Sequence, residues 1–209
     1  MKNILICDDH SVIRKGVRLI LNNEFSDTEF GEACDAKEAF KKMKEKKWDL
    51  LILDIDLPGR NGLEVLKQLK DEESDTRVLV FSMQPEEQMA VRVLKAGADG
   101  YLSKDSANTE LVKAVQMVLS GRKYISPSLA EHLTSQLRNP AGKASHECLS
   151  DREYQTLLLI AGGKTISQIA EQLSLAPSTI SSFRSHILQK MGMKTNAELT
   201  NYAIRNKLI

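Results

Sequence analysis

Short apolar runs alternate with amphipathic stretches over the first 120 residues or so. The run 50–53 is apolar at every position, and a carboxylate and a Pro-Gly turn follow it closely. Such a run is typical of a strand that is buried on both faces of a parallel sheet. Similar runs occur at 4–7, 78–81 and 101–103. We therefore expect parallel strands that are separated by helices.

Helical patterns occupy the stretches between these runs, and Gly121 has the position of a residue that ends the last of them. The expected helices cover residues 11–22, 36–47, 62–72, 86–96 and 107–120. Alternation of this kind, repeated five times, predicts an α/β domain with a doubly wound, five-stranded parallel sheet.

The last 65 residues contain no strand pattern and predict a small all-α domain of four helices. The segments 150–153 and 165–168 have the spacing of capping boxes, and 195–198 caps the last helix. A short helix that ends at Leu173, a tight turn and a longer helix over 177–191 form a helix-turn-helix.

A connection joins the two patterned regions. Ser126 and Pro127 fit the cap and first position of a short helix that ends near Arg138, and 139–145 has the composition of a flexible tether. We expect an α/β domain at 1–120, a linker at 121–145 and a helix-turn-helix domain at 146–209.

Composition and charge narrow the function classes only slightly. Apolar residues make up 42% of the chain and charged residues 27%, which are ordinary globular values. No apolar run approaches a membrane span, and the amino end enters a strand directly, so we expect a cytoplasmic protein without a signal peptide. Three cysteines argue against a disulfide framework, and Cys7 and Cys34 are expected in the core.

The net charge of +1 conceals an uneven distribution. Residues 1–120 carry 18 Lys and Arg against 22 Asp and Glu, whereas 145–209 carry 7 against 5. An acidic first domain suits metal and phosphate chemistry, and a mildly basic second domain suits contact with a polyanion.

Polar side chains follow four of the predicted strands: Asp8 and Asp9, Asp54, Ser82 and Lys104. Open α/β sheets bind ligands at the edge where the carboxyl ends of their strands meet. Close carboxylates repel one another, and Mg²⁺ with its preference for oxygen ligands relieves that repulsion. A carboxylate beside Mg²⁺ and a lysine is a competent nucleophile toward phosphorus.

With these residues in this order, the first domain resembles the flavodoxin-like receiver domain of two-component response regulators, and Gly62 matches too. The resemblance implies that a sensor histidine kinase phosphorylates Asp54. Asp9 and Asp54 would bind Mg²⁺ directly, Asp8 through water, and the Asp56 backbone carbonyl would be a third ligand. It also implies three residues that contact the phosphoryl group or rearrange with it: Ser82, Lys104 and Tyr101. Asp56 departs mildly from the family, in which this side chain is often neutral.

The second domain resembles the LuxR-type DNA-binding domain. Residues 149–153 match its L-[ST]-x-R-E pattern, 163–165 its G-x-[ST] turn, 169–173 its I-A-x-x-L pattern and 179–181 its T-[VI]-[SK] pattern. Receiver followed by LuxR-type domain is the order of the NarL/FixJ family. Ala176 stands where members often have a Ser or Thr cap, which costs about 1 kcal/mol of helix stability if no other group caps the recognition helix.

Both resemblances imply a phosphorylation-dependent transcription regulator that binds double-stranded DNA as a homodimer. RNA polymerase is a further candidate partner. We expect no enzymatic activity beyond self-catalysed phosphoryl transfer to Asp54 and hydrolysis from it. The candidate DNA contacts are Lys164, Thr179, Ser181, Ser182, Arg184, Ser185 and Lys190. Arg184 could read a base, hold a phosphate or pair with a carboxylate such as Glu171, and we favour the phosphate.

Two alternatives remain at this stage. Asp54 and Asp56 have the spacing of the Asp-x-Asp motif of haloacid-dehalogenase phosphatases, but Pro58 stands where that motif continues with Thr or Val. The other alternative is a regulator that works through protein contact, without phosphorylation or DNA binding.

Overall fold

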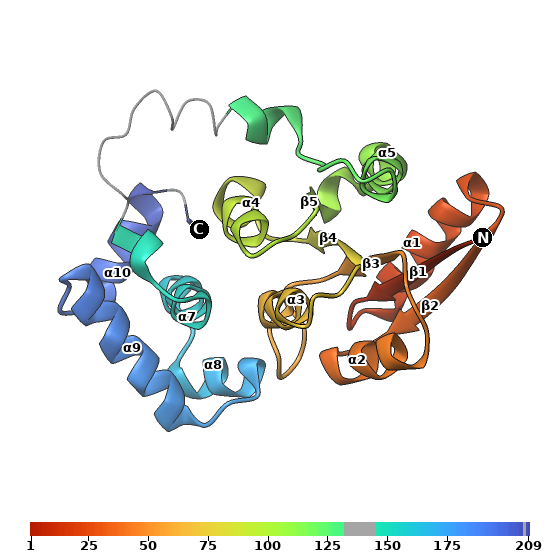
Figure 1. The fold of residues 1–209 in the computed structure, drawn as a ribbon. Coiled ribbons are helices and arrows are strands. Elements are labelled where there is room, and N and C mark those ends of the chain that lie inside the picture. Colours follow the sequence, from red (N-terminus) through yellow and green to blue (C-terminus); the bar gives the residue numbers. More distant parts are fainter. Residues whose placement is uncertain (132–144, 207) are drawn as a thin grey trace. The chain divides into compact units, whose positions relative to one another are not determined.

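A computed structural model describes residues 1–131, 145–206 and 208–209, which fall into two compact units, Met1–Arg138 and Asn139–Ile209 (Figure 1). The predicted end of the linker helix near Arg138, and residues 139–144 of the predicted tether, lie outside the described residues. Within the described residues, no helix combines the length and the hydropathy needed to span a membrane.

The first unit contains a five-stranded sheet in which every pairing is parallel, with the order β2-β1-β3-β4-β5. This confirms the predicted doubly wound fold. The pairs Cys7–Leu53 and Leu53–Val80 bring the ends of β1, β3 and β4 to one edge. The strands are β1 (Lys2–Cys7), β2 (Thr28–Ala33), β3 (Leu50–Leu53), β4 (Arg77–Ser82) and β5 (Gly100–Ser103).

Helices cover both faces of the sheet, and successive strand residues point alternately to the two faces. Leu51 and Val80 pack with α2, α3 and α4, whereas Ile52 and Leu79 pack with α1 and α5. Each of the five α-helices lies within two residues of its predicted bounds, whereas the short helix η1 was not predicted. The helices are α1 (Ser11–Glu24), α2 (Ala36–Glu45), α3 (Gly62–Asp71), α4 (Glu86–Lys95), η1 (Lys104–Ser106) and α5 (Ala107–Leu119).

Strand β2 departs from the apolar pattern of the other strands. It lies at an edge of the sheet, and only Ala33 is buried in it, so its sequence has no continuous apolar run. The prediction that Cys34 belongs to the core is wrong: this residue follows the edge strand and is exposed, and its backbone N–H donates to Glu38. Cys7, on the central strand β1, is buried as predicted.

The second unit is helical, as predicted, and consists of η2 (Ser145–Cys148), α7 (Asp151–Ala161), α8 (Ile166–Leu173), α9 (Pro177–Met191) and α10 (Asn196–Arg205). Capping boxes open α7, α8 and α10 at Ser150, Thr165 and Thr195. Helix α9 begins without a side-chain cap at Ala176. Ser174 adopts a left-handed conformation, with φ of 53°, in the tight turn between α8 and α9.

Candidate functional site

Two carboxylates and one ammonium meet at the carboxyl edge of the sheet. Asp8 follows β1, Asp54 follows β3, and Lys104 follows β5. The Lys104 Nζ lies 2.6 Å from Asp8 Oδ2 and 2.7 Å from Asp54 Oδ2, and all three side chains are at most 6% exposed. The predicted convergence of these residues is therefore present in the structure.

Burial and the neighbouring charges shift the pKa values of Asp54 and Lys104. Removal from water raises the pKa of Asp54 to about 6, although the Lys104 ammonium acts to lower it. Burial alone would lower the pKa of Lys104, but Asp54 and Asp8 hold it above its ordinary value. Lys104 therefore stays charged at neutral pH, while Asp54 is costly to ionise in the absence of a second cation.

Asp9 and His10 complete a group of metal-compatible donors. The His10 Nδ1 lies 2.7 Å from Asp9 Oδ1, and the His10 backbone N–H donates to Asp8 Oδ1 at 2.8 Å. One donor atom from each of Asp8, Asp9, His10 and Asp54 lies within 4.8 Å of the others. Oxygen donors at this spacing suit a hard divalent cation such as Mg²⁺.

The turn after β3 holds Asp54 against the start of α3. A Cβ on Gly62 would lie only 2.1 Å from the Asp54 carbonyl oxygen, so only glycine fits this close approach. The Gly62 N–H donates to the Ile55 carbonyl at 2.9 Å. Asn61, which is buried, caps α3 by accepting from the Leu63 N–H. These contacts fix the backbone that follows Asp54.

Ser82 and Tyr101 lie on neighbouring strands, and neither side chain is exposed. The Ser82 Oγ accepts from the Gln84 N–H at 3.1 Å, and the Tyr101 hydroxyl donates to the Gln84 carbonyl at 2.5 Å. The Gln84 side chain donates to Asp56 at 2.8 Å. Gln84 thus connects both predicted switch residues to the extra carboxylate beside Asp54.

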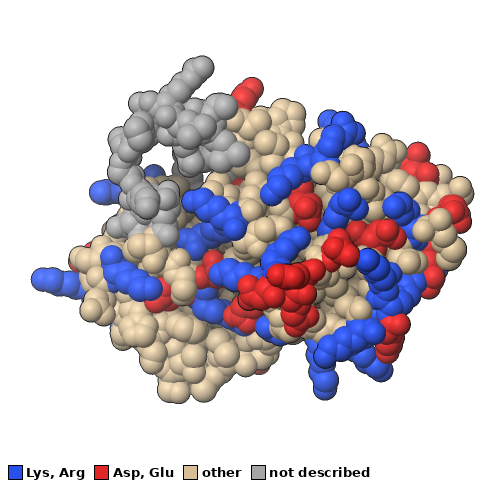
Figure 2. All heavy atoms as spheres, viewed as in Figure 1, with Lys and Arg blue, Asp and Glu red and all other residues tan. Residues whose placement is uncertain are grey.

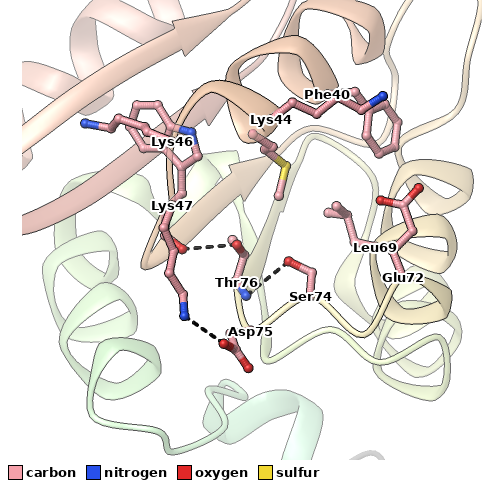
Figure 3. A pocket seen from close by; sticks show the side chains of 11 residues that line it. Phe40, Lys44, Lys46, Lys47, Leu69, Glu72, Ser74, Asp75 and Thr76 are labelled. Atoms are coloured by element: carbon pink, nitrogen blue, oxygen red, sulfur yellow. Dashed lines mark hydrogen bonds and ion pairs between the residues drawn. The ribbon is translucent and has the colours of Figure 1, made fainter.

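A separate pocket of about 430 Å³ lies near the amino ends of β3 and β4, away from the carboxyl edge of the sheet (Figure 3). Its lining comes from the end of α2, the segment before β3, the end of α3 and the segment before β4. Across it, Lys47 pairs with Asp75 at 2.8 Å, and the Thr76 hydroxyl donates to the Trp48 carbonyl. None of the predicted site residues lines this pocket, so it is separate from the cluster of Asp8, Asp54 and Lys104.

Three serines of α9 lie on the surface of the helical unit, and each hydroxyl donates to the carbonyl four residues earlier. These are Ser181 to Pro177 at 3.0 Å, Ser182 to Ser178 at 3.1 Å, and Ser185 to Ser181 at 3.1 Å. Thr179 is half-buried. Each serine oxygen keeps its acceptor capacity, but it would have to leave the helix carbonyl before it could donate to another group.

Both candidate DNA-contacting lysines also make contacts within the helical unit. Lys190 lies 2.6 Å from Glu153, which is buried and belongs to the capping box of α7. Burial would raise the pKa of Glu153, but the Lys190 ammonium and the Ser150 N–H together lower it. Lys164, at the end of the turn before α8, donates to Gln172. The sequence did not indicate either internal contact.

Arg184 is placed by a residue from the next helix. Its Nε donates to the Asn196 Oδ1 at 2.6 Å, so its partner is this amide and not the glutamate that we considered from the sequence. Asn196 is the first residue of α10, immediately after the capping residue Thr195. The two terminal nitrogens of the guanidinium take no part in this bond, and they can address one acceptor group or two.

On the face that Figure 2 shows, charge alone does not mark a binding surface. Lys and Arg are interspersed with Asp and Glu over the face that Figure 2 shows. In residues 145–209, basic residues exceed acidic residues only slightly, by seven to five. The case for a nucleic-acid interface therefore depends on the helix-turn-helix geometry.

Comparison with known families bears on both units. Residues 4–116 match the family described as "Response regulator receiver domain", and residues 147–203 match "Bacterial regulatory proteins, luxR family". The chain belongs to the NarL/FixJ family of response regulators. This assignment confirms both resemblances and sets aside a dedicated phosphatase.

Relatives of this response regulator span the whole chain. Response regulator UvrY of Escherichia coli K12 is 34% identical over all of this chain and 96% of its own length. Response regulator GacA of Pseudomonas protegens is 32% identical over all of this chain and 98% of its own length. A solved structure of RcsB from Salmonella enterica serovar Typhimurium, bound to promoter rprA with the phosphomimetic BeF₃⁻, has a TM-score of 0.67 and 25% identity, and the match covers 97% and 98% of the two chains.

Sequence reasoning missed several residues of this site. His10 was visible beside the acidic pair, but an exposed histidine carries no distinctive pattern. Gln84 interacts mainly through its backbone, which a side-chain pattern does not record. Asn196 follows Thr195 in a recognisable capping segment, so its place at the start of α10 was predictable, but its contact with Arg184 was not.

Proposed function

We propose that this response regulator is phosphorylated on Asp54 and that the phosphoryl group controls DNA binding by the second unit. The observation that carries the proposal is the cluster of Asp8, Asp54 and Lys104, with Nζ–O distances of 2.6 and 2.7 Å at the carboxyl edge of the sheet. Such a cluster has a nucleophile and a cation in place, with a second cation expected from the donor set.

In the proposed reaction, an Asp54 carboxylate oxygen attacks phosphorus while the bond from phosphorus to the kinase histidine nitrogen breaks. The Lys104 ammonium moves from the Asp54 oxygen to an oxygen of the transferred group, where it offsets the new negative charge. Asp9 and Asp54, the Asp56 backbone carbonyl and, through water, Asp8 would hold Mg²⁺, which would supply further positive charge beside the same group. The chain itself thus catalyses transfer to Asp54. Later, water attacks the phosphorus of the acyl phosphate, which releases inorganic phosphate and returns the Asp54 carboxylate.

The proposed response begins at Ser82. A phosphoryl oxygen near the end of β4 is a better acceptor than any neutral group, so the Ser82 hydroxyl turns to donate to it. Ser82 then no longer accepts from the Gln84 N–H, and the Gln84 carbonyl and Tyr101 hydroxyl rearrange with it. We infer that this shift favours a homodimer, which presents two copies of α9 to two half-sites on DNA.

For the DNA interface we propose α9 as the recognition helix. Thr179, Ser181, Ser182 and Ser185 are expected to face the DNA. Arg184 is expected to hold a phosphate, with support from Lys164 and Lys190 at the margins. Short hydroxyls discriminate weakly between bases, so the arginine supplies most of the charge-assisted contact. The proposed setting is the cytoplasm, where a sensor histidine kinase and RNA polymerase are the partners.

DNA titration with and without BeF₃⁻ and Mg²⁺ tests the regulation. We expect binding to tighten by about 5- to 150-fold with the phosphoryl mimic, the usual range for coupled sites, and sedimentation to show a larger species. Equal affinity and equal mass in both states would contradict the proposal.

The Arg184→Ala variant tests the interface. Loss of a phosphate contact should weaken binding by a similar factor on every sequence and make the salt dependence shallower, whereas loss of a base contact should relax specificity at one position. Unchanged affinity on every site would remove Arg184 from the interface. Lys95→Ala, an exposed change in α4 of the other unit, is the matched control.

A further inference from the structure

The chain does not leave the receiver unit when α5 ends. Tyr124 runs beside β5, where the Tyr101 N–H donates to the Tyr124 carbonyl at 3.3 Å and the Tyr124 N–H donates to the Asp99 carbonyl at 2.9 Å. Tyr124 is 1% exposed, and its hydroxyl donates to Glu110 of α5 at 2.9 Å. The start of the predicted linker is therefore bound along the free edge of the sheet.

The next residues dock on the first residue of α4. The Ser126 hydroxyl donates to Glu86 Oε2 at 2.5 Å, and the Ser128 hydroxyl donates to the same oxygen at 3.4 Å. Ser126 also caps the short helix that follows it, by accepting from the Leu129 N–H at 3.1 Å. Leu129 is 1% exposed and belongs to the same apolar cluster as Tyr101. We call Tyr124, Ser126, Ser128 and Leu129 the linker latch.

One carboxylate oxygen of Glu86 gains no hydrogen bond from this docking. The second carboxylate oxygen of Glu86 is buried and has no hydrogen-bond partner among the described residues. A buried oxygen in that state gives up part of its hydration without replacement, which favours any rearrangement that returns it to water. The contact between Glu86 and the two serines is therefore one that a small displacement of α4 can open.

Only three residues separate Glu86 from the switch residue Ser82. Within that segment, the Gln84 N–H donates to Ser82, and the Gln84 carbonyl accepts from Tyr101. The Pro85 carbonyl then begins the hydrogen bonds of α4 by accepting from Met89. A turn of Ser82 toward a phosphoryl group releases Gln84, and the backbone that carries Glu86 moves with it. Tyr101 adds a second route, since it touches Gln84 with its hydroxyl and Tyr124 with its backbone N–H.

We propose that the linker latch is closed on Glu86 when Asp54 is unphosphorylated and opens when Asp54 is phosphorylated, which passes the state of the site to the chain that leads into the DNA-binding unit. The inference rests on the proposed function, since it takes the movement of Ser82 as its trigger. It goes further by naming the contact through which the change leaves the receiver unit. That contact joins the Glu86 carboxylate at the start of α4 to Ser126 and Ser128, which follow β5 and α5 in the chain.

Hydrogen exchange of the full chain tests this directly. We expect BeF₃⁻ with Mg²⁺ to speed exchange of the amides over 124–131 by about 5-fold or more. Glu86→Ala should produce the same increase without BeF₃⁻ and leave little further change when it is added. Glu45→Ala, which removes an exposed carboxylate at the end of α2, should behave like the wild type. Glu86→Gln, which keeps the shape of the side chain, should fall between wild type and Glu86→Ala.

A second readout in the same samples distinguishes failure of the linker latch from failure of the proposed function. Slower exchange in the segments around Asp54 and Ser82 reports that BeF₃⁻ has bound. If those segments respond while 124–131 does not, the latch is wrong and the proposed function stands. If neither responds, the proposed function fails at its first step. If Glu86→Ala and Glu45→Ala exchange alike over 124–131, Glu86 does not hold the segment.

Discussion

Replacement of Asp54 by asparagine should stabilise the metal-free receiver unit at neutral pH. The pKa of Asp54 is about 6 in the folded chain and near 3.8 in an ordinary setting, because its carboxyl is buried. A raised pKa means that the folded state binds the proton more tightly, so the wild type loses stability as pH rises from about 4 to about 6. Two pKa units correspond to about 3 kcal/mol, which is the upper limit of the gain for Asp54→Asn above that window.

The gain should fall short of that limit, because Lys104 loses one of its two carboxylate partners and keeps only Asp8. We expect Asp54→Asn to be more stable by about 1–3 kcal/mol at pH 7.5 in chelator, and close to the wild type near pH 4. Urea unfolding followed by Trp48 fluorescence measures this, since it is the chain's single tryptophan and is buried in the receiver unit. Added Mg²⁺ should stabilise the wild type and close the gap.

Asp49→Asn is the matched control with the opposite sign. The Asn3 N–H donates to the Asp49 carboxylate at 2.8 Å and lowers its pKa, so ionised Asp49 stabilises the fold above its ordinary pKa. That variant should lose stability at neutral pH, and the loss should shrink on acidification. If Asp54→Asn is less stable than the wild type at pH 7.5 in chelator, or if the difference does not depend on pH, burial of Asp54 does not control its ionisation.

Two further predictions follow from local geometry. Gly62→Ala should destabilise the receiver unit by about 3 kcal/mol in the same urea assay, because the added Cβ would meet the Asp54 carbonyl oxygen, which cannot move without displacing the site. A loss under about 0.5 kcal/mol would show that the turn relaxes freely. Thr165→Ala should destabilise the helical unit by about 1 kcal/mol, because it removes the capping box of α8. Thermal melting followed by helical circular dichroism measures this, with Ser167→Ala as the exposed control. Equal melting of the two variants would contradict the prediction.

The parts of the fold that the sequence predicts are those with a strong local pattern. Strand β3 is apolar throughout because both of its faces are covered, and the capping boxes at Ser150 and Thr165 record helix starts in side-chain chemistry. Strand β2 was harder to assign, because an edge strand with one covered face needs no continuous apolar run. The same cause explains the error at Cys34, which follows β2 into solvent.

The residues of the candidate site likewise include some that the sequence predicts and some that it does not. Asp8, Asp54 and Lys104 follow predictable strands, and parallel strands bring their ends together, so their convergence could be expected. Contacts between elements that are distant in sequence could not be expected, because no periodicity encodes them. The bond from Arg184 to Asn196 and the docking of Ser126 on Glu86 both depend on how two helices meet, which only the packed structure shows.

The most direct test of the account is phosphorylation of the intact chain by a small phosphodonor with Mg²⁺, read by intact mass. We expect that one phosphate is added, that Asp54→Asn abolishes the addition, and that excess chelator prevents it. Asp56→Asn, which changes the exposed carboxylate two residues away, should still be labelled. Undiminished labelling of Asp54→Asn, or labelling of the wild type in chelator, would contradict the assignment of Asp54 as the nucleophile of a metal-assisted site.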